Sequence, residues 1–115
     1  MRKLLGCALI AIAGSSAHAD SPQGKFIWGA GNTSCGQYVA TIDRHDEVLL
    51  LATGAWMQGY ITSFNDYLGY QHKPPLRFTD PDSINAYAAK FCRDNPLKTI
   101  HSATLELIGE LQADK

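Results

Sequence analysis

The chain has no excess of charge of either sign, since ten Lys and Arg stand against eleven Asp and Glu in 115 residues, a formal net charge of −1. A protein that holds a phosphate backbone needs a basic surface, so nucleic-acid binding is not expected. Low-complexity tracts and repeats of fixed period are also missing, which excludes solenoids, fibrous proteins and disordered chains. What is present is a 45% share of hydrophobic residues, typical of one small folded domain.

Hydrophobic runs long enough to cross a membrane are missing too. The apolar stretch over residues 4–13 is about half of the roughly 20 residues that a spanning helix needs. It follows a basic start at residues 1–3 and precedes an A-x-A motif at residues 17–19, whose small residues fit a signal peptidase site. We therefore expect residues 1–19 to be a signal peptide cleaved after Ala19, and the mature chain to be periplasmic, without a membrane anchor.

Two alternatives remain open for this end of the chain. The L-L-G-C sequence of residues 4–7 resembles the processing box of a lipoprotein, although only three residues precede it. The other alternative is a buried amino-terminal helix of a cytosolic protein, which would leave the basic start and the A-x-A motif unexplained.

Cysteine is scarce, and its count fits an oxidising compartment. Cys7 would leave with the signal peptide, so Cys35 and Cys92 remain as an even pair. Such a pair in a secreted chain predicts a disulfide. The bond would enclose 56 residues, a loop for which the entropy model gives about 4 kcal/mol of stabilisation. The alternative, Cys35 as a thiolate nucleophile, needs a thiol that this compartment would oxidise.

Patterns that mark metal and catalytic sites are missing as well. His45, His72 and His101 lie in three separate segments, without the spacing that places two ligands on one helical face. We therefore expect no metal ion and no cofactor. An enzyme interpretation would make His45 a general base oriented by Asp43 or Asp46. No nucleophile accompanies this group, which is more typical of a solvated helix cap, so no catalytic residue is expected.

Capping signals and apolar periodicity predict an all-α domain of four helices over residues 34–113. Ser34 with Gln37 fits a capping box, and proline follows a capping residue at Pro81 and Pro96. The expected helices run from Cys35 to about Asp43, from Asp46 to about Tyr67, from Pro81 to just beyond Cys92, and from Pro96 to about Gln112. A proline pair makes residues 69–79 an exposed crossing loop.

Helical spacing also predicts which positions face inward. In the central helix the apolar face would include Val48, Leu49 and Tyr67, and its glycines Gly54 and Gly59 indicate that another helix crosses closely. In the last helix the apolar stripe would begin at Leu97.

Residues 20–33 are rich in Gly, Ser, Pro and Asn and are expected to form a flexible lead-in, with the side chain of Trp28 folding back onto the domain. The central helix carries an aromatic stripe of Trp56, Tyr60 and Phe64. Such a stripe is usually core, but a domain of this size cannot bury every large side chain. The stripe is therefore also a candidate binding surface, for a partner protein or for a second copy in a homodimer.

Three motifs carry a resemblance to a known family: S-C-G-Q-Y at residues 34–38, W-x-x-G-Y at 56–60 and F-C-R-x-N-P-L at 91–97. With the signal peptide, they resemble the small periplasmic helical proteins related to the HdeA and HdeB acid-stress chaperones, over roughly residues 34–111. In that family one disulfide holds a helical domain that loosens at low pH and exposes apolar surface to unfolding proteins. The resemblance implies the same role for Cys35 and Cys92.

Two non-enzymatic functions follow as expectations. The first is an acid-stress chaperone whose partners are unfolding periplasmic proteins at low pH. The second is an inhibitor of one specific partner, because the plan of a secreted helical domain with a disulfide is also similar to the Rap1a and Tai immunity proteins.

Mass spectrometry of secreted protein under non-reducing conditions tests the processing and the disulfide together. We expect a chain of 96 residues that begins at Asp20 and is two hydrogens lighter than the reduced sequence. A product with free thiols would contradict the prediction.

Overall fold

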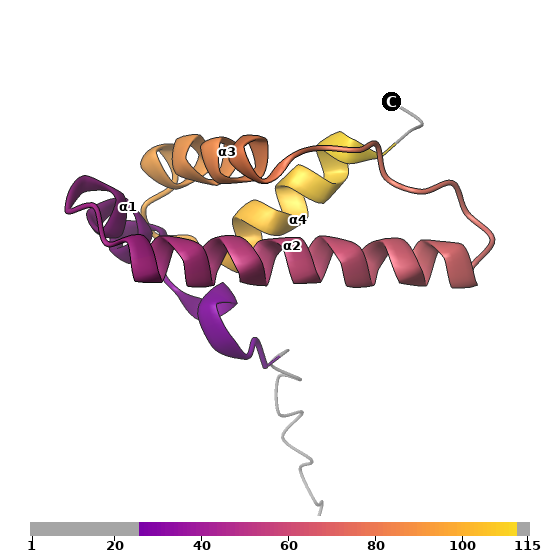
Figure 1. Cartoon of the computed structure of the whole chain (residues 1–115), viewed down its shortest axis with the longest axis horizontal. Helices are drawn as coiled ribbons and strands as arrows, with labels where there is room; N and C mark the ends of the chain where they lie inside the picture. Colours follow the sequence, from indigo (N-terminus) through magenta and orange to yellow (C-terminus); the bar gives the residue numbers. More distant parts are fainter. Residues whose placement is uncertain (1–25, 113–115) are drawn as a thin grey trace, which may run out of the picture.

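Four α-helices and one short 3-10 helix make up the fold, which a computed structural model describes for residues 26–112 (Figure 1). They are η1 (Gly29–Asn32), α1 (Cys35–Asp43), α2 (Glu47–Tyr70), α3 (Pro81–Asp94) and α4 (Ile100–Leu111). Within the described residues the only β-type pairing is an isolated bridge between Ser34 and Thr99, so the predicted all-α class is confirmed. The predicted signal peptide and the lead-in up to residue 25 lie outside the described residues.

Each α-helix begins at a residue whose side-chain oxygen accepts a backbone N–H three positions further on. The capping residues are Ser34, Asp46, Asp80 and Thr99, which accept from Gln37, Leu49, Ser83 and Ser102 respectively. Gln37 Oε1 also accepts from the Ser34 N–H, which completes the predicted capping box. A side-chain cap is therefore present at the start of every α-helix among the described residues.

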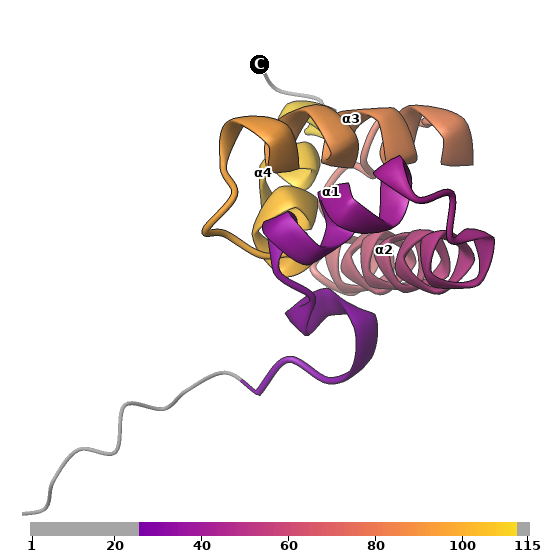
Figure 2. The same cartoon turned by 90° about the vertical axis from the view of Figure 1, so that its left-hand side faces the viewer.

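The helices pack in a small bundle. Helices α2 and α3 run along opposite sides, α4 crosses between them, and α1 closes one end against both (Figures 1 and 2). The predicted disulfide is present and joins Cys35 in the first turn of α1 to Cys92 in the last turn of α3. Both cysteines are fully buried. Their core neighbourhood includes Tyr38, Met57 and Ile100, none more than 1% exposed.

The last helix begins later than predicted, at Ile100 instead of Pro96. The intervening segment bonds to α1 instead: Pro96 O accepts from the Gly36 N–H at 3.1 Å, and Lys98 O accepts from the Cys35 N–H at 2.8 Å. These carbonyls satisfy donors at the start of α1 that have no partner within that helix. Leu97 consequently points away from the core, with 97% of its surface exposed.

The buried face of α2 differs in part from the predicted one. Its buried positions are Thr53, Gly54, Met57, Ile61 and Leu68. Val48, Leu49 and Tyr67 were predicted to face inward and are exposed instead. At its carboxyl end α2, which has 24 residues, extends beyond α3 and α4 (Figure 1), and Tyr67 in this part is 53% exposed. Val48 and Leu49 lie in the first turn, near α1, on sides of the helix that the core does not cover.

Helices α1 and α2 both end in a Schellman motif with histidine where glycine is usual. His45 has φ 55° and His72 has φ 54°, in the left-handed region. The His45 N–H donates to Ile42 O, and the next N–H donates to Thr41 O. The histidine that was a candidate general base therefore ends a helix.

The crossing loop before α3 is attached at two points. Leu76 is buried, and its N–H donates to Asn65 Oδ1 on α2 at 2.8 Å. The Arg77 N–H donates to Leu111 O at 2.7 Å, and its guanidinium donates to Glu110 O. Arg77 thus satisfies carbonyls at the end of α4, which have no partner within the helix.

The two glycines of α2 provide a matched test of helix packing. A Cβ at position 54 would lie 3.0 Å from Asn85 Oδ1 on α3, whereas one at position 59 would have no neighbour within 4 Å. We expect Gly59→Ala to raise the free energy of unfolding by about 1 kcal/mol, from helix propensity alone. We expect Gly54→Ala to lower it by up to about 2 kcal/mol, because overpacking outweighs that gain.

Urea unfolding of the two variants beside the parent protein measures both changes. Equal stabilisation by the two substitutions would contradict the close approach of α3 at Gly54.

Candidate functional site

The predicted aromatic stripe lies along one edge of α2 and is half-buried. Trp56, Tyr60 and Phe64 all pack against the core, yet each keeps part of its surface in solvent. The rings of Trp56 and Tyr60 stack at 5.2 Å, and both meet the ring of His101 on α4 edge-on. His101 Nε2 and Tyr60 Oη are 3.2 Å apart, within hydrogen-bond distance. The stripe is therefore both core and surface.

Trp56 also holds the lead-in on the domain. Its Nε1–H donates to Trp28 O at 2.8 Å. The backbone of η1 lies so close to the indole that a Cβ at Gly31 would overlap its six-membered ring. The lead-in thus ends in an ordered turn, where sequence analysis predicted a flexible segment through residue 33. The contact with the domain is made by the Trp28 carbonyl, whereas its side chain, predicted to fold back, is 82% exposed.

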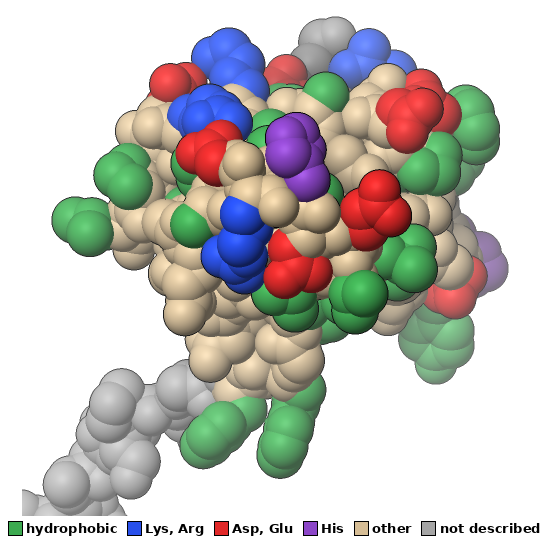
Figure 3. All heavy atoms as spheres, turned by 60° about the vertical axis from the view of Figure 1, so that its left-hand side comes forward, with side chains coloured by type: hydrophobic (Ala, Val, Ile, Leu, Met, Phe, Trp, Pro, Cys, Tyr) green, Lys and Arg blue, Asp and Glu red, His purple; other side chains and the backbone are tan. Residues whose placement is uncertain are grey.

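Large apolar side chains remain in solvent at several places. They include Phe26 and Trp28 before η1, Val48 and Leu51 at the start of α2, Tyr67 and Tyr70 at its end, Phe78 in the crossing loop and Leu97 before α4. The rings of Phe26 and Trp28 lie 6.3 Å apart. Figure 3 shows hydrophobic side chains projecting around a face on which acidic and basic groups are mixed. Exposed apolar area of this kind is available for protein contacts.

The candidate catalytic group is not assembled. The Asp43 carboxylate pairs with Arg93 on α3 at 3.0 Å. The Asp46 carboxylate accepts from the Leu49 N–H and from Arg44, so neither acid orients His45. In the part of the chain that the structure describes, no cluster of three His, Cys, Asp or Glu side chains could hold a metal ion.

A groove of about 440 Å³ lies between η1, α1 and α2, a feature that sequence analysis did not predict. Methyl and hydroxyl groups line its walls, contributed by Ala30, Ala40, Ala52, Thr33, Thr41 and Thr53, and Gln37, Arg44 and Leu49 complete the lining. The volume lies within the range of about 300–1,000 Å³ that is usual for ligand pockets.

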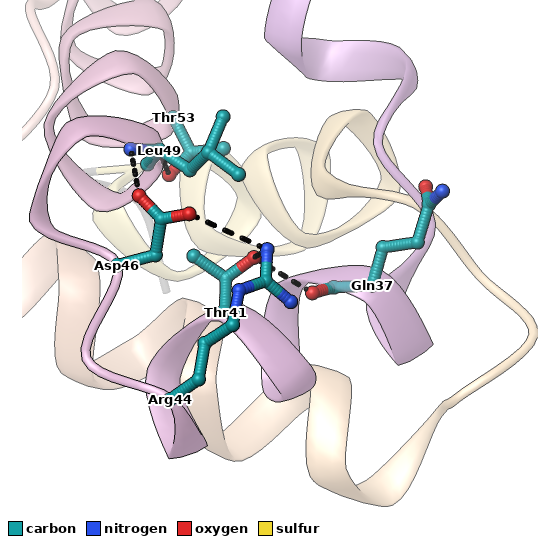
Figure 4. A network of polar contacts seen from close by, with 6 residues as sticks. All are labelled: Gln37, Thr41, Arg44, Asp46, Leu49 and Thr53. Carbon is teal, nitrogen blue, oxygen red and sulfur yellow. Dashed lines mark hydrogen bonds and ion pairs between the residues drawn. The ribbon is translucent and has the colours of Figure 1, made fainter.

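A polar network runs along the groove where α1 meets α2 (Figure 4). Arg44 Nη2 donates to the Thr41 hydroxyl at 3.3 Å and to Asp46 Oδ2 at 3.5 Å, and Asp46 Oδ1 accepts from the Leu49 N–H. The Thr41 and Thr53 hydroxyls donate to carbonyls one helical turn back. Arg44 carries the only charge among the described residues that line the groove.

Comparisons with known proteins find no match to this chain among family models, curated proteins or solved structures. Across residues 26–112, none of the helices has the length and hydropathy needed to span a bilayer.

Gly31→Ala tests whether Trp56 holds the lead-in. We expect the overlap with the indole to displace η1, so that the Thr33 N–H, which donates to Ala30 O, exchanges with solvent faster than in the parent. Hydrogen-exchange NMR of that amide is the measurement.

Gly36→Ala is the matched control, because its Cβ would meet only Pro96 O, at an ordinary 3.7 Å. Unchanged exchange at Thr33 in Gly31→Ala, or equal acceleration in the control, would contradict the anchoring role of Trp56.

Proposed function

We propose that this protein is a non-enzymatic periplasmic chaperone of the HdeA/HdeB kind, which binds unfolding proteins at low pH. The observation that carries the proposal is the aromatic edge of α2, where Trp56, Tyr60 and Phe64 are only partly buried in the folded domain. A modest loosening of α4 or η1 would uncover more of the Trp56 and Tyr60 rings, which contact His101 of α4 and, for Trp56, the backbone of η1. Aromatic side chains carry the largest apolar area per residue and dominate contact energies.

Acid would weaken contacts at both ends of the bundle. The Asp43–Arg93 pair joins α1 to α3, and the carboxylates of Asp46 and Asp80 cap α2 and α3. Hydrogen bonds from the Ser83 hydroxyl and then from the Ser83 N–H hold the pKa of Asp80 below its usual range. The contribution of Asp80 to stability is therefore present above about pH 4 and is lost as the pH falls through its lowered pKa.

Net charge acts in the same direction. A chain cleaved after Ala19 carries eight Lys and Arg and eleven Asp and Glu, a net charge of −3. At pH 2 to 3 its carboxylates are mostly protonated and its three histidines are charged, so the net charge approaches +12 with the amino terminus. Self-repulsion then opposes the compact state.

The disulfide limits how far this opening proceeds. It joins α1 to α3 through two fully buried sulfur-bearing residues, Cys35 and Cys92, and so preserves that contact while ionic contacts are lost. No disulfide joins α4 or η1 to α2 among the described residues. The aromatic edge can therefore open while α1 and α3 stay joined.

An inhibitor of one specific partner is the second candidate. The observation that favours it is the Phe26–Trp28 pair, which is exposed without any acid-induced change. An inhibitor would bind one protein tightly at pH 7, whereas a chaperone would suppress the aggregation of several unrelated proteins at pH 3. Aggregation assays at both pH values, with pull-down from periplasmic extract, separate the two functions.

Phe64→Ser tests the aromatic edge, and Phe78→Ser is the matched control, because Phe78 is 95% exposed in the crossing loop. We expect Phe64→Ser to weaken suppression of aggregation at pH 3 strongly. The same substitution should lower the unfolding midpoint at pH 7 only slightly. Phe78→Ser should change neither.

If Phe64 serves only the core, the substitution costs about 3–5 kcal/mol at every pH. A collapse of stability at pH 7, or unchanged suppression at pH 3, would therefore contradict a binding role for this edge.

A further inference from the structure

We propose that the groove between η1, α1 and α2 binds the carboxyl-terminal end of a short extended peptide at neutral pH, with the terminal carboxylate on Arg44. This binding activity goes beyond the acid-dependent function proposed above and uses other residues than the aromatic edge. It rests on the charge, the lining and the volume of the groove.

The charge of the groove favours an anion. Arg44 is its only charged lining residue within the described part of the chain, and the nearest carboxylate, that of Asp46, makes a single contact of 3.5 Å. The other oxygen of Asp46 accepts from the Leu49 N–H. Both hydrogen bonds of Arg44 use Nη2, which leaves the N–H groups of Nη1 and Nε to donate to a ligand. A carboxylate is one of the acceptors that a guanidinium binds most strongly, through two parallel N–H···O bonds.

The lining favours a peptide over a hydrocarbon chain. The Thr53 hydroxyl donates to Leu49 O and keeps its lone pairs for a peptide N–H. Gln37 uses Oε1 to accept from the Ser34 N–H, which leaves Nε2 to donate to a peptide carbonyl. A hydrocarbon would cover these polar groups without pairing them, at a cost in free energy. The methyl groups of Ala40 and Ala52 leave room for small or branched side chains.

The probe is the peptide acetyl-Ala-Leu-Ala with a free carboxylate, titrated into the full mature protein at pH 7 by calorimetry. The same peptide with a carboxyl-terminal amide and octanoate are the comparison ligands. We expect saturable binding of the free acid, at least about tenfold weaker binding of the amide, and weaker binding of octanoate than of the peptide. Trp56 adjoins η1 at Gly29 and Gly31, so the tryptophan fluorescence of the protein, to which Trp28 also contributes, is a second readout.

Two pairs of variants locate the site. Arg44→Gln should weaken binding of the free acid at least about tenfold, whereas Arg93→Gln, an exposed arginine on α3 outside the groove, should leave it unchanged. Ala52→Leu should block the groove, whereas Ala55→Leu, also exposed on α2 but outside the lining, should not. Circular dichroism confirms that each variant is folded.

Four results would overturn the proposal, and the first three concern the peptide. They are no saturable binding of the free acid up to about 1 mM, equal affinity for acid and amide, or equal affinity of the Arg44→Gln variant and the parent. Tighter binding of octanoate would also overturn it, because the ligand would then be a hydrocarbon carboxylate. Loss of chaperone activity at pH 3 would leave these titrations unaffected, so the two proposals fail separately.

Discussion

The bond between Cys35 and Cys92 places the start of α1 beside the end of α3, and the arrangement of the other elements depends on this placement. The chain that leaves α3 then passes the first turn of α1 and gives it the carbonyls of Pro96 and Lys98 as acceptors. Because of these bonds α4 begins only at Ile100, and from there it runs from the level of α2 up to α3, in contact with both (Figure 2). One covalent contact thus sets where the last helix begins and which side chains it brings to α2.

Features that depend on neighbours in sequence were predicted well. The caps at Ser34 and Asp80 lie three residues from their donors, so their chemistry is visible in a short stretch of sequence. The predicted start of α4 was wrong because the N–H groups that donate to Pro96 O and Lys98 O belong to α1, some sixty positions earlier in the chain. A capping residue followed by proline predicts a helix start only when the carbonyls of the next residues do not accept hydrogen bonds from a distant part of the chain.

The candidate site shows the same difference between features set by nearby sequence and features that depend on distant contacts. Helical spacing placed Trp56, Tyr60 and Phe64 on one edge, since that depends only on the period of α2. The role of Trp56 as the anchor of η1 depends on a carbonyl 28 positions away. The groove forms only where η1, α1 and α2 come together in the fold. The sequence therefore marked Arg44 only as a charged residue at a helix end, not as part of a groove.

Trp56 connects the two surfaces physically. One side of its indole stacks on Tyr60 within the aromatic edge, and the backbone of η1, which forms one wall of the groove, lies against it. A ligand that binds only the ordered arrangement of η1, α1 and α2 stabilises that arrangement by mass action. In the opening proposed at low pH the same indole would move away from η1, so a ligand in the groove would oppose that opening. Under the two proposals, occupation of the groove and exposure of the edge would therefore be coupled through Trp56.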